Sequence, residues 1–489
     1  MLAEMRSRLK AFWMDLDPMV PMVMGGAIIG FVGSIAVELF RKAMYAIIHL
    51  YSTHEHLVAA AAGLPLWERA LIPVVCGTLG GAIMWAGHRW IKQPSGPEYM
   101  EAVRVGDGKL ALGPNITRTL SSLVGVSGGI TIGREGTMIQ FAALISSMFG
   151  RLVPTDAAHR RLFVACGAAA GFAGAYHAPI AGTMFVSEIV LGGLALREVT
   201  AILVSAVIGE LTTQALFATG PLYLSHPVPM VGFSDLLDAA LIGLLAGLIG
   251  PMFLWLLDTT RRRYRKMVTF LPLRMGLAGL AIGLLSIARP EVWGNGYSVV
   301  QSFLVTHWAL STVVIVSFLR ILAVTAASAA GIPGGVLTPT LTMGAGLGLI
   351  VFHTLLTSTA THSQALWVLV GMGSLLAATT HAPAMSAIMV FEVTRNYNVV
   401  LAAMPACVLA SVIGSLLRDH SVYTEALGLE EGRRKPSLLD AITGRGARGG
   451  HKEAGAGHAP PHGMECVTSD VGGAAVPAPH CETAESSHS

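Results

Sequence analysis

Long apolar segments recur along this chain and constrain its fold more than any other feature. They cover residues 20–50, 67–88, 200–217, 233–257, 275–287, 312–330, 336–356, 365–378, 382–393 and 401–417. About 20 apolar residues in a helix suffice to cross a bilayer. Because 53% of the residues are hydrophobic and only 12% are charged, we expect an all-α polytopic membrane protein rather than a soluble enzyme.

Clustered basic residues predict how the chain is oriented in the membrane. Residues 1–19 carry Arg6, Arg8 and Lys10 and are expected to form a cytoplasmic N-terminal helix. The apolar segment 233–257 is followed by five basic residues between 261 and 266, the strongest cytoplasmic signal in the chain. The first apolar segment would then leave the cytoplasm and segment 233–257 would return to it, so the two halves cross in opposite senses.

An internal repeat supports this division into halves. Residues 177–190 read HAPIAGTMFVSEIV and residues 381–394 read HAPAMSAIMVFEVT, each with a glutamate eleven residues after the histidine. We expect a first membrane repeat over 20–220 and a second over 221–430, in inverted topology. Such repeats place a substrate site between them, near the midplane. Residues 431–489 are poor in large apolar side chains and are expected to be a disordered cytoplasmic tail.

The segment 128–140, GGITIGREGTMIQ, places a charged pair between glycines in front of an apolar helical run. Charge at membrane depth is costly and usually marks an ion pathway or a buried partner. Gly133 and Gly136 permit close backbone approach, and a following helix N-terminus offers free N–H groups. The pattern predicts an anion-binding site for which the Glu135 carboxylate competes with the anion. Arg134 is expected either to bind loop carbonyls or to attract anions at long range.

Several motifs in order resemble the CLC family of chloride channels and chloride/proton exchangers, over nearly all of residues 1–430. They are SGPEYMEAV, GREGT, HAPIAG with its downstream glutamate, PGGVLTP, HAP with Glu392, and SVYTEAL. The resemblance implies many tilted and broken helices in a CLC-type inverted repeat. It also implies a homodimer with one anion pathway in each subunit, both termini cytoplasmic, and chloride as the substrate. A bacterial inner membrane location is expected, with lipid and chloride as partners, no nucleic acid and no cofactor.

The resemblance also implies roles for individual residues. Glu135 matches the gating glutamate, and Ser95 matches the serine whose hydroxyl contacts the central anion. The backbone near Val336 and Leu337 matches N–H groups that face this anion, and Tyr423 matches the tyrosine that closes its inner side. With Gly133, Arg134 and Gly136 from the GREGT segment, these residues form the expected chloride-binding set.

The sequence departs from the family pattern at the position of the cytoplasmic proton station. Without gaps this position falls on Ile189, and Glu188 is rotated from it by about 100° on a helix. We therefore expect channel-like chloride movement, with Glu188 and Ile189 as the candidates to test for a proton pathway. A chloride/proton antiporter is the first alternative. A fluoride exporter is the second, and Ser95 speaks against it.

The sequence departs from the family pattern at three other places. They are the shortened loop at Pro94–Pro97, Thr137 in place of a proline and Leu337 in place of a phenylalanine.

Structural roles compete with these functional ones. Glu135 could form only a salt bridge with Arg134, but adjacent residues on a helix do not face each other. Ser95 could only cap a helix and Tyr423 could be an interfacial aromatic. The matching pairs of the repeat are expected to be structural: Glu188 and Glu392 as hydrogen-bonded scaffold, and His177 and His381 as caps at helix starts.

A function of another class is a rhomboid-like intramembrane serine protease. Residues 125–128 read GVSG, so Ser127 would be the nucleophile with His177 or His381 as its base. Chain length, the repeat and GREGT argue against it, and no enzymatic activity is expected. The five cysteines have neither metal-ligand nor disulfide spacing, and the tail histidines His451, His458 and His462 are expected to be solvated, so no metal site is expected.

Overall fold

The computed structural model describes residues 19–91, 98–153, 155–193, 196–217, 220–356 and 363–424. All regular elements within these ranges are helices, and one isolated antiparallel bridge joins Gly133 to Gly335. The expected N-terminal helix, up to residue 18, and the expected tail at 431–489 lie outside the described residues.

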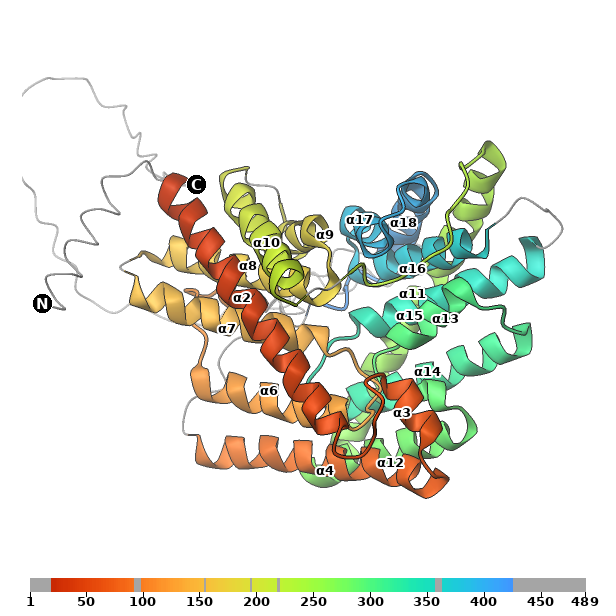
Figure 1. Ribbon diagram of the computed structural model, residues 1–489, viewed down its shortest axis with the longest axis horizontal. Helices are drawn as coiled ribbons and strands as arrows, with labels where there is room; N and C mark the ends of the chain where they lie inside the picture. The colour runs from red at the N-terminus through yellow and green to blue at the C-terminus, as the bar shows by residue number, and fades with distance from the viewer. Residues whose placement is uncertain are drawn as a thin grey trace, which may run out of the picture. The chain divides into compact units, whose positions relative to one another are not determined.

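The helices fall into two series along the chain (Figure 1). The first series is α2 (Met19–Ile48), α3 (Leu57–Gly63), α4 (Leu66–Trp90), α5 (Tyr99–Arg104), α6 (Leu112–Ser127), α7 (Glu135–Leu152), α8 (Ala157–Tyr176), α9 (Pro179–Met184), the π-helical η1 (Phe185–Leu191) and α10 (Leu196–Phe217). The second is α11 (Phe233–Met267), α12 (Leu271–Ala288), η2 (Pro290–Val292), α13 (Tyr297–Val305), α14 (Leu310–Ala330), α15 (Leu337–Val351), the π-helical η3 (Phe352–Leu356), α16 (Gln364–Thr380), α17 (Pro383–Thr394) and α18 (Asn398–Leu417).

Eight helices among the described residues are long and apolar enough to cross a membrane. Their ends agree with the predicted apolar segments to within a few residues, except at α11. This helix does not stop at Leu257 but continues to Met267, so the basic run forms its last turns. Cations are favourable there because the C-terminal end of a helix carries a partial negative charge.

Several helices between the long spans are short, such as α9 and α17, and others are deeply buried. From Leu162 to Tyr176, α8 is buried on all sides, as is α16 from Ala365 to Thr380. A helix without a polar face belongs inside a helical assembly. The alanines and glycines of α8 permit this close packing, for example at Gly171, where a Cβ would lie 2.9 Å from the Ala142 Cβ and the Ile139 Cα of α7.

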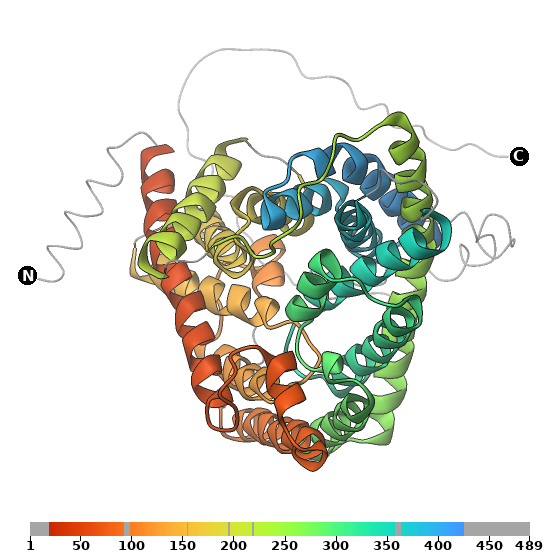
Figure 2. The same ribbon diagram turned by 45° about the vertical axis from the view of Figure 1, so that its right-hand side comes forward.

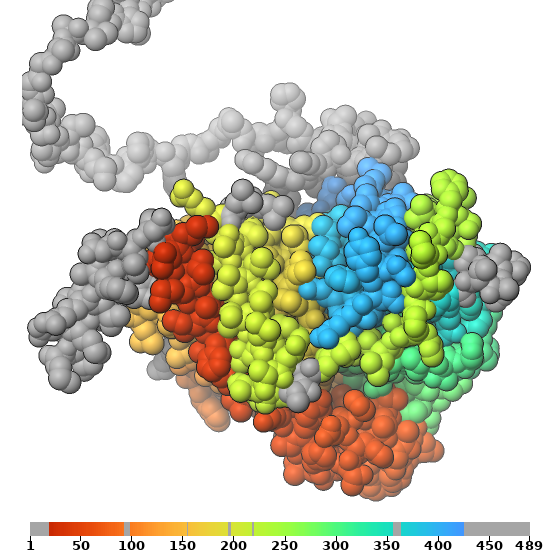
Figure 3. Space-filling model, turned by 45° about the horizontal axis from the view of Figure 1, so that its top comes forward, coloured from red at the N-terminus to blue at the C-terminus, as the bar shows by residue number. Residues whose placement is uncertain are grey.

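The two series pack in the same manner. In the first, α2 contacts α8 and α10, α7 contacts α8, and α9 contacts α8 and α10. In the second, α11 contacts α16 and α18, α15 contacts α16, and α17 contacts α16 and α18. Figures 1 and 2 show the first series, red to yellow, beside the second, green to blue, with α4 and α12 meeting at the lower edge. On the face in Figure 3, α10 lies between red α2 and the blue α17 and α18.

Reciprocal hydrogen bonds join the two series at α9 and α17, which pack together. Glu392, near the end of α17, accepts bonds from the amides of Ile180 at 3.0 Å and Ala181 at 2.6 Å, in the first turn of α9. Glu188, in η1, accepts a bond from the amide of Met385 at 2.9 Å, in the first turn of α17. Each glutamate thus satisfies amides that a helix N-terminus leaves without intrahelical partners.

The histidines of the repeat do not cap the helices that follow them, contrary to the prediction. Ala178 and Ala382 occupy those N-cap positions. His177 and His381 instead end α8 and α16, in left-handed conformations with φ of 55° and 58°. A left-handed residue reverses the chain at a helix C-terminus, and the proline two residues later begins the next helix.

Candidate anion site

Two helix starts from opposite halves of the chain meet at one point. The amide of Gly133 donates to the carbonyl of Gly335 at 2.8 Å, and the amide of Gly335 donates back at 2.8 Å. Directly afterwards α7 begins at Glu135 and α15 begins at Leu337. A Cβ at Gly133 would lie 2.7 Å from the Gly335 oxygen, and one at Gly136 would lie 3.1 Å from the Gly335 nitrogen. Glycine at both positions therefore permits the approach.

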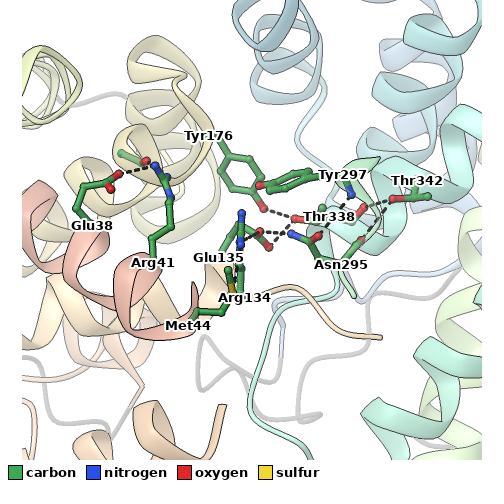
Figure 4. Close-up of polar contacts among 11 residues, drawn as sticks. Glu38, Arg41, Met44, Arg134, Glu135, Tyr176, Asn295, Tyr297, Thr338 and Thr342 are labelled. Atoms are coloured by element: carbon green, nitrogen blue, oxygen red, sulfur yellow. Dashed lines mark hydrogen bonds and ion pairs between the residues drawn. The ribbon is translucent and has the colours of Figure 1, made fainter. Parts of the chain in front are cut away.

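The carboxylate of Glu135 lies between these helix starts and is held by two donors (Figure 4). Its Oε1 accepts a hydrogen bond from the Asn295 amide at 2.6 Å, and its Oε2 accepts one from the Thr338 hydroxyl at 2.7 Å. Glu135 is only 1% exposed. A buried carboxylate is tolerated where donors and a helix N-terminus stabilise its charge.

Tyr176 extends this hydrogen-bond network. Its hydroxyl lies 2.9 Å from the Thr338 hydroxyl. Because Thr338 gives its proton to the carboxylate, Tyr176 must donate to Thr338. The Tyr176 ring also packs at 4.7 Å on Phe172, which stacks at 4.9 Å on Phe185. Tyr423 meets the edge of Phe185 at 5.6 Å, so a continuous aromatic row runs from Tyr423 to the carboxylate network.

Arg134 and Glu135 form the ion pair that their adjacency in sequence argued against. The Arg134 Nε lies 3.5 Å from the Glu135 Oε1. The argument assumed that both residues lie within a helix, but Arg134 is the N-cap of α7 and only Glu135 is inside it. The guanidinium also lies over the Tyr297 ring, 5.4 Å from its centroid, and donates to the Met44 sulfur at 3.2 Å. Three contacts therefore fix this cation at the site.

Asn295 and Thr338 are site residues that the sequence reasoning missed. Asn295 lies in the loop between η2 and α13, and its pairing with Glu135 spans 160 residues. The available signals were a polar residue between two glycines and, for Thr338, the position directly after Val336 and Leu337. Arg320, a charge within the apolar segment 312–330, was a third signal, and it proves to hold the Asn295 loop through three backbone carbonyls.

The structure brings most of the predicted chloride-binding residues together. Gly133, Arg134 and Gly136 surround the Glu135 backbone, while Val336 is the N-cap of α15 and Leu337 its first residue. Tyr423 is connected to this group through the rings of Phe185, Phe172 and Tyr176. Ser95 lies outside the described residues. Ile189 is a buried side chain of η1 in the apolar core, and the half-buried Glu188 beside it is engaged with α17.

The residues of the protease hypothesis do not form a catalytic pair. Ser127 donates its hydroxyl hydrogen bond to the Leu123 carbonyl at 2.7 Å. The His177 ring instead contacts Glu210, with Nδ1 3.1 Å from Oε2. A serine nucleophile needs a hydrogen bond to its base, and within the described ranges the Ser127 hydroxyl bonds to Leu123 rather than to His177 or His381. No group of three or more metal-ligating side chains occurs in the part of the chain that the structure describes.

Comparison with known proteins identifies the family. Residues 79–415 match the family model described as voltage gated chloride channel. The chain therefore belongs to this family of chloride channels and transporters, the CLC family. It is 43% identical over 410 residues to a ClcB-like protein of Ralstonia nicotianae, covering 82% of this chain and 95% of that protein. It is 41% identical over 409 residues to the voltage-gated ClC-type chloride channel ClcB of Citrobacter koseri, covering 81% and 97%.

Solved structures share the fold. A slow cyanobacterial Cl⁻/H⁺ antiporter aligns with a TM-score of 0.74 and 23% identity, over 85% of this chain and 98% of that one. A CLC-type fluoride/proton antiporter aligns with a TM-score of 0.68 and 20% identity, over 83% and 97%. The predicted fold class is confirmed: an all-α, multi-pass membrane protein with the family's inverted repeat and broken helices.

Proposed function

We propose that this protein moves chloride across the membrane and that Glu135 gates the pathway. The observation that carries this proposal is the buried Glu135 carboxylate between two helix N-termini and two side-chain donors. A seat that satisfies a carboxylate can also satisfy a chloride ion, because both carry one negative charge and accept hydrogen bonds. Family membership and the names of the relatives support chloride as the anion.

The chemistry of the seat suits conduction. Donors that carry only partial charges hold an anion weakly enough for it to leave. Arg134, the full cation nearby, is already engaged by Glu135, Tyr297 and Met44. When the carboxylate is ionised it competes with chloride for the donors, and when it is protonated it loses this advantage. Gly133, Gly136, Val336, Leu337, Ser95 and Tyr423 are proposed to contribute to the same pathway.

We propose channel-like movement rather than strict proton coupling. Ile189 is apolar and buried, and cannot carry a proton. Glu188 accepts a hydrogen bond from the first turn of α17, which favours a structural role over that of a mobile proton carrier. A chloride/proton antiporter is the alternative, favoured by the fold shared with the cyanobacterial antiporter. We also propose a homodimer in a bacterial inner membrane, with both termini cytoplasmic and repeats over 20–220 and 221–430.

Chloride efflux from liposomes tests the gate. Glu135→Gln removes the titratable charge at nearly constant volume, so we expect faster chloride efflux and loss of its pH dependence. The measurement uses purified protein in chloride-loaded vesicles, with efflux followed between pH 4.5 and 7.5. A Glu135→Gln variant that blocks chloride, or that keeps the wild-type pH profile, contradicts the gating role.

Proton movement in the same vesicles distinguishes channel from antiporter. A chloride gradient with a pH-sensitive dye inside should produce no uphill proton transport if movement is channel-like. Stoichiometric proton pumping would establish the antiporter, and its loss in Glu188→Gln would make Glu188 the inner proton carrier. Fluoride loaded in place of chloride tests the exporter alternative, which a clear preference for fluoride would support.

A further inference from the structure

The Asn295 side chain donates a short hydrogen bond to Glu135. It is 8% exposed and belongs to the loop Trp293–Gly296, which connects η2 to α13. The loop contributes a side-chain amide bonded to the carboxylate, at 2.6 Å. Figure 4 shows Asn295 and Thr338 approaching the carboxylate from the second half of the chain, while Glu135 and Arg134 come from the first.

The orientation of this amide follows from its partners. A carboxylate can only accept, so the Nδ2 group must face Glu135. The Oδ1 atom on the other side accepts from the Tyr297 amide at 3.4 Å. Both ends of the amide are therefore engaged, and a flipped amide would place two acceptors against each other.

The loop is held rigidly by a buried charge. Arg320 of α14 is 1% exposed and donates to the carbonyls of Glu291 at 2.6 Å and Gly294 at 3.1 Å. Gly294 and Gly296 take left-handed conformations, with φ of 73° and 109°. A Cβ at Gly296 would lie 2.1 Å from the Thr342 hydroxyl oxygen and 2.7 Å from an Arg320 nitrogen. Burying a guanidinium is costly, so its use here indicates that the position of this loop matters.

Other charged and titratable groups also act on the Glu135 carboxylate. Arg134 is its ion-pair partner, and Arg134 in turn neighbours Tyr45 of α2. The phenols of α8, of the segment before α11 and of α13 lie within electrostatic reach: Tyr176, Tyr223 and Tyr297. Asn295 and Thr338, which do not titrate, donate hydrogen bonds of 2.6 and 2.7 Å to the carboxylate, and Asn295 does so from a loop anchored by Arg320.

We propose that Asn295 is a positioning residue that latches the ionised Glu135 side chain in the anion seat and so sets the pH at which the pathway opens. This inference rests on the proposed gating function. A donor stabilises the charged carboxylate more than the protonated one. Loss of the donor makes protonation easier, so opening should occur at higher pH.

The pH profile of chloride efflux tests the latch. In Asn295→Leu the midpoint should rise by about one to two pH units, the range expected for losing one hydrogen bond to a charged group. In Asn295→Asp it should rise further, because a second negative charge then faces Glu135. The double variant Glu135→Gln/Asn295→Leu should be independent of pH, as Glu135→Gln alone is, because the group on which Asn295 acts is gone.

Asn398→Leu is the matched control. Asn398 also ties a loop to a helix, by donating to the Val228 carbonyl at 2.8 Å, but has no bond to Glu135. Its efflux midpoint should stay at the wild-type value. If Asn295→Leu does not fold, Thr338→Val provides an independent test, because removing the donor to Oε2 should shift the midpoint in the same direction.

The outcomes separate the latch from the gate. If wild-type efflux depends on pH but the Asn295→Leu midpoint equals the wild-type midpoint or lies below it, the latch is overturned and the gate stays intact. Equal shifts in Asn295→Leu and Asn398→Leu also overturn it, since any loosened loop would then suffice. A wild type without chloride efflux overturns the proposed function itself, and the latch with it.

Discussion

Gly133 controls how closely the two halves of the chain approach at the anion site. Its backbone pairs with Gly335, and a Cβ there would lie 2.7 Å from the Gly335 carbonyl oxygen and 2.9 Å from the Glu135 Oε2. One methyl group would therefore disturb the bridge between the halves and the seat of the carboxylate together. Neither oxygen can move away easily, since the Gly335 oxygen belongs to the backbone and the Glu135 Oε2 is held by Thr338.

We expect Gly133→Ala to cost about 1–3 kcal/mol of stability, the usual range for overpacking, and to flatten the pH dependence of chloride efflux. Thermal unfolding in detergent and efflux from liposomes measure the two effects. Gly125→Ala is the control, because the nearest atom to a Cβ at Gly125 is 3.6 Å away. Equal behaviour of the two variants would show that the glycine bridge has no special role.

Of the residues at the anion site, Glu135 could be predicted from the sequence, but Asn295 could not. The charged pair between glycines identified Glu135, because the cost of charge in a membrane makes such a pair informative. Asn295 gave no comparable signal, since an asparagine between two glycines is also an ordinary turn. Its role depends on a contact across 160 residues, which no local pattern encodes.

The elements were predictable where the bilayer alone dictates their length. Segments such as α14 and α18 are apolar over most of their length, as a membrane-spanning helix must be, and their ends follow from hydropathy. Helix α6 could not be predicted in this way. It buries Asn115, Thr119, Ser121 and Ser122 against neighbouring helices, so its polar residues lie inside. Hydropathy alone does not identify such a segment as a membrane-spanning helix.

A capping residue fixes the start of α8. Asp156 is its N-cap and accepts a hydrogen bond from the His159 amide at 2.8 Å. Asp156→Ala should destabilise the protein by about 1 kcal/mol, lowering the apparent melting temperature by about 2 °C. Asp156→Asn keeps an acceptor and should retain most of this stability. Equal losses in both variants would assign the effect to charge instead of capping.

The contribution of Asp156 should also depend on pH. The amide and then the ring of His159 lower the pKa of Asp156 below its ordinary value of 3.8. A lowered pKa in the folded state means that the stabilisation is complete above the unfolded pKa and declines as pH falls through the folded one. The difference between wild type and Asp156→Asn should therefore be constant near neutral pH and shrink below about pH 4.

On the scale of the whole molecule, neither half is complete. Besides α4 on α12 and α9 on α17, the halves share the Gly133–Gly335 bridge and the site itself. We expect residues 1–219 and 220–489 to be unstable when expressed separately, and to form an extractable complex when expressed together. Gel filtration in a mild detergent measures this. A monodisperse, heat-stable first half on its own would contradict it.

The reciprocal glutamates place a condition on the order of biosynthesis. The amides of Ile180 and Ala181 donate to Glu392, which lies 212 and 211 positions further along the chain and is synthesised later. The ribosome must therefore complete nearly the whole membrane region before α9 acquires its acceptors. Until then the newly inserted first half lacks the acceptor that these two amides have in the folded protein. These two bonds of the first repeat can therefore form only after α17 has been synthesised.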